Sequence, residues 1–185
     1  GLIVNKDLIS DRILAELKLP VICLHGDDSS LLNTPSLTVD HFMIAKMAVD
    51  YYANLGFRNF AYCGVDNYEW SRRRGHYFQQ AVNASGYRLF YYKGSAKSKK
   101  KSWNEQIKSI AKWVKKLPEK TAMLCCNDEQ AECVVKACEQ ADVIVPEDIA
   151  VLGIDNDEFI CELSFPSISS ICVNYEEAGY QAAEM

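Results

Sequence analysis

The stretch at residues 145–157 (VPEDIAVLGIDND) constrains the fold most, because a strand pattern ends there at acidic side chains. Pro146 cannot continue a preceding helix, and the apolar, β-branched run after it predicts a buried strand. Gly153 and Asp155 then place a carboxylate at the carboxyl end of that strand. In an open α/β sheet, ligands bind at this end of the strands, so Asp155 is a candidate binding residue.

Strand and helix patterns alternate along the rest of the chain. Strands are expected at 2–4, 20–24, 36–40, 60–64, 88–92 and 123–126, besides the run before Asp155. Helices are expected at 7–17, 41–55, 70–84, 107–117 and 128–140. Such alternation predicts an α/β fold in which helices cover both faces of a parallel sheet.

Composition excludes several classes of protein. The chain has 185 residues, 49% of them apolar and 24% charged, which is typical of a soluble globular protein. A net charge of -5 argues against a direct grip on a nucleic-acid backbone, which needs a concentrated basic face. No apolar run is long enough to cross a membrane and the first residues do not form a signal peptide, so no membrane contact is expected.

The eight cysteines lie mostly within apolar patterns, and they form no CxxC pair and have no histidine at metal-binding spacing. They are interpreted as reduced core thiols of a cytoplasmic protein, with a disulfide framework as the alternative. No metal or cofactor is expected. Two polar stretches, the turn cluster at 25–30 and the lysines within 93–101, are interpreted as solvated loops, with an inter-domain contact as the alternative for the lysines.

Several segments resemble the effector-binding domain of the lactose- and galactose-repressor type, which shares its fold with periplasmic sugar receptors. They are 39–41, 55–61, 74–78, 121–128, 145–157, 165–171 and 177–183. One departure is Tyr77, which stands where the family has a small glycine. The resemblance implies a periplasmic-binding-protein-like type I fold with two lobes, each a parallel sheet flanked by helices. Residues 1–65, rejoined by 170–185, would form an incomplete amino-terminal lobe, and residues 66–169 the carboxyl-terminal lobe.

Within this superfamily the chain is similar to a branch of xylose-responsive activators that carry an AraC-type DNA-binding module. The similarity lies in the Trp70 to Arg74 spacing and in the segments 102–104, 111–113 and 153–156. It implies a sugar-sensing domain of a bacterial transcriptional regulator, which binds a pentose such as xylose. It further implies lobe closure on the sugar, a cytoplasmic homodimer, and DNA contact through a separate module.

Recognition of a polyol needs a carboxylate that accepts hydroxyl protons, a guanidinium that donates, and an aromatic ring that covers an apolar sugar face. Arg74 and Asp155 match the ligand-contacting arginine and aspartate of the family, and either Asn127 or Asp128 occupies its third position. Asp40 and Trp70 are further candidates. Each has a structural alternative: a turn for Asp155, a solvated helix face for Arg74, a helix cap for Asp40 and Asp128, and a core position for Trp70.

The sequence lacks the motifs that common enzyme classes require. The sequence has no GxGxxG, GxxxxGK[ST], GxSxG or HExxH motif, and its three histidines are isolated. We therefore expect no catalytic residues and no enzyme activity. The alternatives that stay open are a sugar receptor of a transport system and an unrecognised α/β enzyme.

Overall fold

The strands form two separate parallel sheets, each in its own unit of the chain. A computed structural model describes residues 1–5, 9–24, 34–92 and 102–185. The lysine stretch and the turn cluster at 25–30 lie outside these residues. Unit 1 comprises Gly1–Asp40 and Val173–Met185, and unit 2 comprises His41–Cys172.

Unit 2 is a five-stranded sheet with the order β5-β4-β6-β7-β8, in which every neighbouring pair is parallel. Its strands are β4 (Asn59–Cys63), β5 (Arg88–Tyr91), β6 (Thr121–Cys125), β7 (Ile149–Ile154) and β8 (Ser169–Ile171). Its helices are α2 (His41–Asn54), α3 (Glu69–Ala84), α4 (Trp103–Val114), α5 (Asp128–Ala141) and α6 (Glu158–Leu163). Within this sheet β4 comes first in the sequence. The next strand, β5, pairs on one side of β4, and the later strands β6, β7 and β8 extend the sheet on its other side, so the strand order reverses between β4 and β6.

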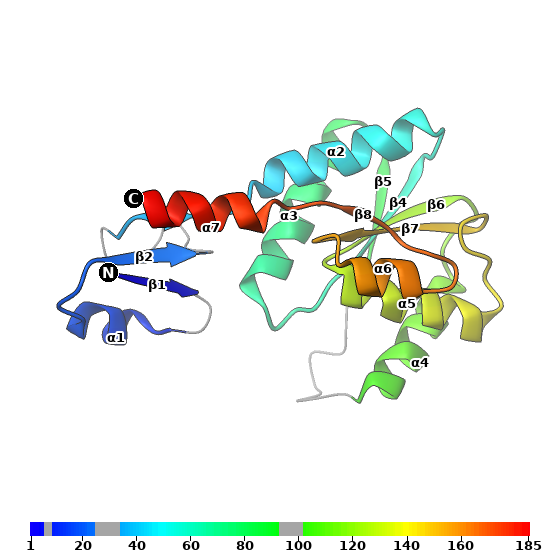
Figure 1. Cartoon of the computed structure of the whole chain (residues 1–185). Coiled ribbons are helices and arrows are strands. Elements are labelled where there is room, and N and C mark those ends of the chain that lie inside the picture. The colour runs from blue at the N-terminus through cyan, green and yellow to red at the C-terminus, as the bar shows by residue number, and fades with distance from the viewer. Residues whose placement is uncertain (6–8, 25–33, 93–101) are drawn as a thin grey trace. The chain divides into compact units, whose positions relative to one another are not determined.

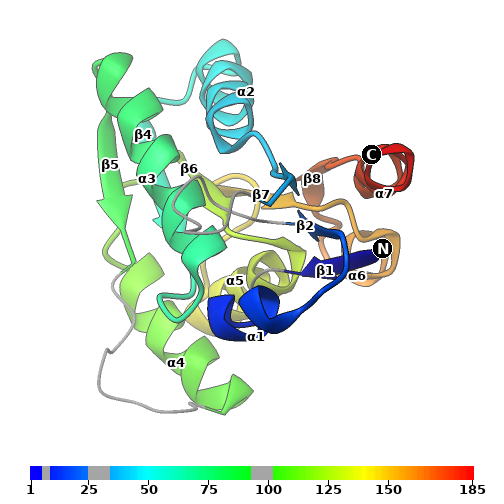
Figure 2. The ribbon, with the colours of Figure 1, turned by 90° about the vertical axis from the view of Figure 1, so that its left-hand side faces the viewer.

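Helices cover both faces of this sheet (Figures 1 and 2), α2 with α3 on one face and α4 with α5 on the other. Alternation along β4 decides which side chain faces which layer. Phe60 and Tyr62 contact Phe78 of α3, whereas Ala61 and Cys63 belong to the core cluster beneath α4 and α5. The predicted parallel sheet with helices on both faces is therefore confirmed.

The helix ends follow the expected capping chemistry. Ser102 and Glu105 form a capping box at the start of α4, and the Asn127 side chain accepts from the Gln130 backbone N–H at the start of α5. Gly56, after α2, has φ +88° and thus the left-handed backbone expected of a glycine that ends a helix. Two helices lie outside the ranges expected from periodicity: α6, which is short and begins at the cap Asp157, and α7 (Tyr175–Glu184), where the sequence offered only the family resemblance at 177–183.

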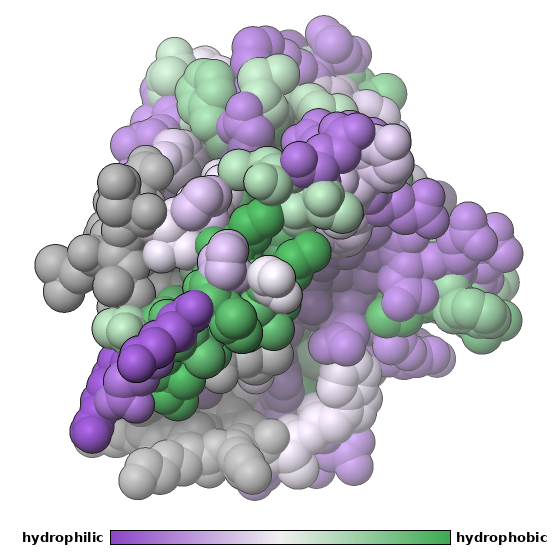
Figure 3. Space-filling model, turned by 60° about the vertical axis from the view of Figure 1, so that its left-hand side comes forward, coloured by the Kyte–Doolittle hydropathy of each residue, from purple (hydrophilic) through white to green (hydrophobic). Residues whose placement is uncertain are grey.

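Unit 1 has a three-stranded parallel sheet with the order β1-β2-β3, together with α1 and α7. Its elements are β1 (Leu2–Asn5), α1 (Asp11–Glu16), β2 (Val21–Leu24), β3 (Ser36–Leu37) and α7 (Tyr175–Glu184). Several of its large apolar side chains are exposed, namely Leu2, Ile3, Ile13 and Leu19. Figure 3 shows hydrophobic residues gathered on the face turned toward the viewer.

The boundary between the units differs from the expected one near residue 65. The structure places it after Asp40, because β4 pairs with β5 and β6 and because α2 packs on α3. Tyr52 of α2 is 2% exposed and its hydroxyl donates to the Ala150 carbonyl of β7 at 2.9 Å. Residues 41–65 therefore belong to unit 2. The return to unit 1 begins at Val173, close to the expected residue 170.

Candidate ligand-binding site

The central feature of the candidate site is an ion pair between Arg74 and Asp155. Arg74 lies on α3, after β4, and Asp155 directly follows β7, so both residues lie at the carboxyl edge of the sheet in unit 2. The Arg74 Nη2 group donates to Asp155 Oδ1 at 2.9 Å. The Arg74 side chain is 4% exposed and that of Asp155 is 29% exposed. The pair is thus largely withdrawn from water, while part of the carboxylate stays open to a ligand.

Two further contacts fix the Arg74 guanidinium. Its Nη1 group donates to the backbone carbonyl of Cys126, and the Trp70 ring lies over its face with 5.2 Å between the ring centroid and Cζ. Trp70 is itself half-buried and stacks on Tyr68. A planar group held by two acceptors and an aromatic face has one orientation, and that orientation is aimed at Asp155.

Asn127 and Asp128 follow β6 and have different local tasks. The Asn127 Oδ1 atom accepts from the Gln130 backbone N–H at 3.0 Å, so Asn127 is the cap of α5. Asp128 is 2% exposed, and its carboxylate accepts from Ser170 Oγ at 2.6 Å and from the Asp157 backbone N–H at 2.7 Å. Burial raises the pKa of the Asp128 carboxyl, while these hydrogen bonds oppose that rise. The alternative in which Asp128 caps α5 is therefore wrong, because Asn127 does so.

The structure thus brings Arg74, Asp155 and Trp70 together, and it places Asn127 next to Cys126, whose carbonyl binds Arg74. Asp40 is the last residue of unit 1 and is exposed. Sequence reasoning missed the Cys126 carbonyl and the partners of Asp128. The only available indication was that Asp157 is a polar residue just beyond the predicted strand that ends at Asp155, since no strand was predicted at Ser170. Within the described part of the chain, no three His, Cys, Asp or Glu side chains are grouped to hold a metal ion.

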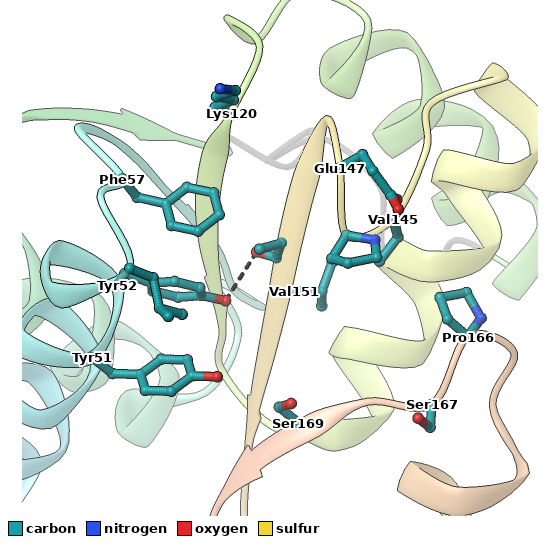
Figure 4. Close-up of a pocket in the computed structure, with 13 residues that line it drawn as sticks. Tyr51, Tyr52, Phe57, Lys120, Val145, Glu147, Val151, Pro166, Ser167 and Ser169 are labelled. Carbon is teal, nitrogen blue, oxygen red and sulfur yellow. Dashed lines mark hydrogen bonds between the residues drawn. The ribbon is translucent and has the colours of Figure 1, made fainter.

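A pocket of about 550 Å³ lies at the other edge of the sheet, beside the amino ends of β6, β7 and β8. Figure 4 shows Tyr51 and Tyr52 projecting from α2 toward β7, with Pro166 and Ser169 across the pocket. None of the predicted binding residues lines it. Its charged residues, Lys120 and Glu147, are both exposed, so this pocket has no desolvated ion pair of the kind formed by Arg74 and Asp155. The desolvated pair of Arg74 and Asp155 lies at the carboxyl edge instead.

A parallel sheet whose strand order reverses between β4 and β6, with polar side chains gathered there, defines the class of open α/β domains that bind ligands at a topological switch point. Residues 49–185 match the family of periplasmic binding protein-like domains, and the chain belongs to this family. No helix among the described residues has the length and apolar character needed to span a membrane.

The chain is similar to the xylose operon regulatory protein of Haemophilus influenzae, with 31% identity over 154 residues, 82% of this chain and 40% of that protein. It is also similar to the solved structure of a xylose-binding transcription activator, with 26% identity and a TM-score of 0.85 over 98% of this chain and 50% of the other. The chain therefore spans half or less of the length of these relatives. A dimeric lac repressor structure, 20% identical, matches 100% of this chain and 67% of its own with a TM-score of 0.81, which shows the fold. The predicted resemblance to the lactose-repressor type is confirmed.

Proposed function

We propose that this chain is the sugar-sensing domain of a bacterial transcriptional regulator, and that its ligand is a pentose such as xylose. The observation that carries the proposal is the Arg74–Asp155 pair, which is desolvated on the arginine side and open on the aspartate side. The names of two similar proteins, a xylose operon regulator and a xylose-binding activator, support the choice of sugar.

In this proposal each side chain has a defined task. Asp155 accepts hydrogen bonds from sugar hydroxyls with its remaining lone pairs, and Arg74 donates to a sugar oxygen while it keeps Asp155 in place. Trp70 offers an apolar ring beside the guanidinium. Asn127 is a further contact, and Asp40 stays a prediction made from the sequence. A sugar that leaves one of these groups unpaired loses about 1 to 3 kcal/mol of binding free energy, which provides selectivity.

The regulator would work in the cytoplasm as a homodimer. DNA contact would come from a separate module, because a net charge of -5 does not suit a phosphate-binding surface. Sugar that binds one arrangement of the protein more tightly than another would shift the population toward it. No chemical change in the sugar is proposed.

Calorimetry with xylose, arabinose, ribose, glucose and galactose tests the proposal. We expect xylose to bind, and Asp155→Ala to weaken that binding at least tenfold. Glu162→Ala, which removes an exposed charge on α6, is the matched control and should leave the affinity unchanged. Chromatography of the sugar after incubation should recover it unaltered. Undiminished binding by Asp155→Ala would show that the site lies elsewhere, and a converted sugar would indicate an enzyme.

A further inference from the structure

The loop that carries Asp155 has an unusual backbone. Asp155 has φ 107° and Asn156 has φ 57°, so two successive residues that are not glycine lie in or near the left-handed region. Side chains disfavour this conformation, and it persists only where the surrounding structure holds it. The loop therefore has to be held by hydrogen bonds to residues outside it.

Three successive backbone N–H groups of the loop each have a partner outside it. The N–H of Asp155 donates to the Ile171 carbonyl at 3.0 Å, and that of Asn156 donates to Ser170 Oγ at 3.0 Å. The N–H of Asp157 donates to Asp128 Oδ2 at 2.7 Å. Two of the partners belong to β8 and the third to α5, so the loop is held from both of these elements.

Asp128 connects the partners with one another. Its Oδ1 atom accepts from the Ser170 hydroxyl at 2.6 Å, so the same carboxylate binds the Asp157 N–H directly and orients the group that binds the Asn156 N–H. The Asp128 side chain is nearly fully buried, where such charge-assisted hydrogen bonds are stronger than in water. A Cβ atom on Gly153 would lie 2.0 Å from Asp128 Oδ1, so a glycine in β7 leaves the space that this carboxylate fills.

We propose that Asp128 is a positioning residue, which holds loop 155–157 so that the Asp155 carboxylate meets the Arg74 guanidinium. A ligand need not contact Asp128 in this arrangement. The effect of Asp128 on sugar affinity rests on the function proposed above, whereas its effect on the loop does not.

Four variants separate positioning from general destabilisation. Asp128→Ala removes both acceptors. Asp128→Asn keeps an oxygen for the Asp157 N–H and offers an amide donor to Ser170 Oγ. Ser170→Ala removes the partner of the Asn156 N–H and the hydroxyl that donates to Asp128 Oδ1, but it leaves the Asp157 N–H its acceptor. Glu129→Ala, an exposed neighbour on the first turn of α5, removes the same charge without touching the loop and is the control.

Hydrogen exchange of the backbone amides, measured by NMR, reads the loop directly. We expect Asp128→Ala to accelerate exchange at Asp157 and Asn156 about tenfold or more, since a buried donor without an acceptor is costly. Ser170→Ala should accelerate exchange at Asn156 well above that at Asp157. Asp128→Asn and Glu129→Ala should stay within about twofold of the parent chain. If Asp128→Ala does not fold, the exchange rates at Asn156 in Ser170→Ala and in Asp128→Asn still test whether these hydrogen bonds hold the loop. Unchanged exchange at 155–157, or equal acceleration throughout unit 2, would overturn the proposal.

Xylose affinity, measured on the same variants, tests the consequence for binding. We expect about tenfold weaker binding for Asp128→Ala and recovery for Asp128→Asn. Undiminished affinity in a variant whose loop exchanges faster would contradict positioning for the ligand. If the parent chain itself does not bind xylose, the sugar assignment is wrong, and hydrogen exchange alone decides whether Asp128 holds the loop.

Discussion

Gly153 and Asp128 occupy adjoining space: a Cβ atom on Gly153 would lie 2.0 Å from Asp128 Oδ1 and 3.1 Å from Cγ. Gly153 lies in β7, two residues before Asp155, and Asp128 is the first residue of α5. A side chain at position 153 must therefore displace the carboxylate that binds Ser170 and Asp157. Loop 155–157 therefore requires a glycine at position 153, near the end of β7.

Gly153→Ala should lower the free energy of unfolding by about 1 to 3 kcal/mol, the range expected for overpacking a core. The matched control is Gly179→Ala on α7, where a Cβ atom meets nothing within 4 Å. This change should be neutral or stabilise by up to about 1 kcal/mol, because alanine favours a helix. Differential scanning calorimetry of both variants checks the contrast, and equal stability would contradict the packing described.

Arg74→Lys should also destabilise unit 2, by about 1 to 3 kcal/mol, because one ammonium group cannot reproduce the planar contacts to Cys126, Asp155 and Trp70. The control is Arg72→Lys, since Arg72 forms an exposed pair with Glu69. Exposed pairs contribute about 0 to 1 kcal/mol. Urea unfolding followed by tryptophan fluorescence reports unit 2, which contains all three tryptophans. A larger loss of unfolding free energy for Arg72→Lys than for Arg74→Lys would contradict the contacts described for Arg74.

Tyr51 and Tyr52 provide a test within one helix. The buried Tyr52 hydroxyl donates to the Ala150 carbonyl at 2.9 Å, whereas Tyr51 is 49% exposed. Tyr52→Phe should cost about 1 kcal/mol of unfolding free energy and Tyr51→Phe close to none. Urea titrations of the two variants decide whether α2 is anchored to β7. Equal effects would place Tyr52 outside the core.

Cys172 should be the first cysteine to react with iodoacetamide in the folded chain. It is exposed, whereas the other seven cysteines are buried. Burial raises the pKa of Cys126 to about 11 and that of Cys133 to about 12, so both stay unreactive thiols at neutral pH. Mass spectrometry should detect one early adduct in the parent chain and none in Cys172→Ser over the same time. Early modification of Cys126 would contradict this burial.

The contribution of Asp128 to the stability of unit 2 should decrease as the pH rises above 3.8, the ordinary pKa of an aspartic acid. Burial raises the pKa of Asp128 in the folded chain, so between the two pKa values the folded state binds more protons than the unfolded state. The stability contributed by protonated Asp128 is complete below the lower pKa and is lost as the pH passes the higher one. Urea unfolding of Asp128→Asn and the parent chain over this range isolates the effect. An identical pH dependence in the two chains would exclude it.

Local sequence determined much of the fold and part of the site. Apolar runs that alternate with helical stripes predicted every strand except β8 and every helix except α6 and α7. Asp155 could be chosen as a candidate because ligands bind at the carboxyl ends of the strands in an open α/β sheet, whereas Arg74 and Asn127 were chosen through the family resemblance.

Tertiary structure alone decided the rest. The boundary moved from residue 65 to residue 40 because β4 and α2 gain their burial from partners distant in sequence, which periodicity does not identify. Asn127 and Asp128 are equally good helix caps by residue type, yet only Asn127 binds its own helix. Asp128 instead reaches Ser170, 42 residues away, and Asp157, 29 residues away. A carboxylate takes the nearest donors in space, and that choice is made only when the chain has folded.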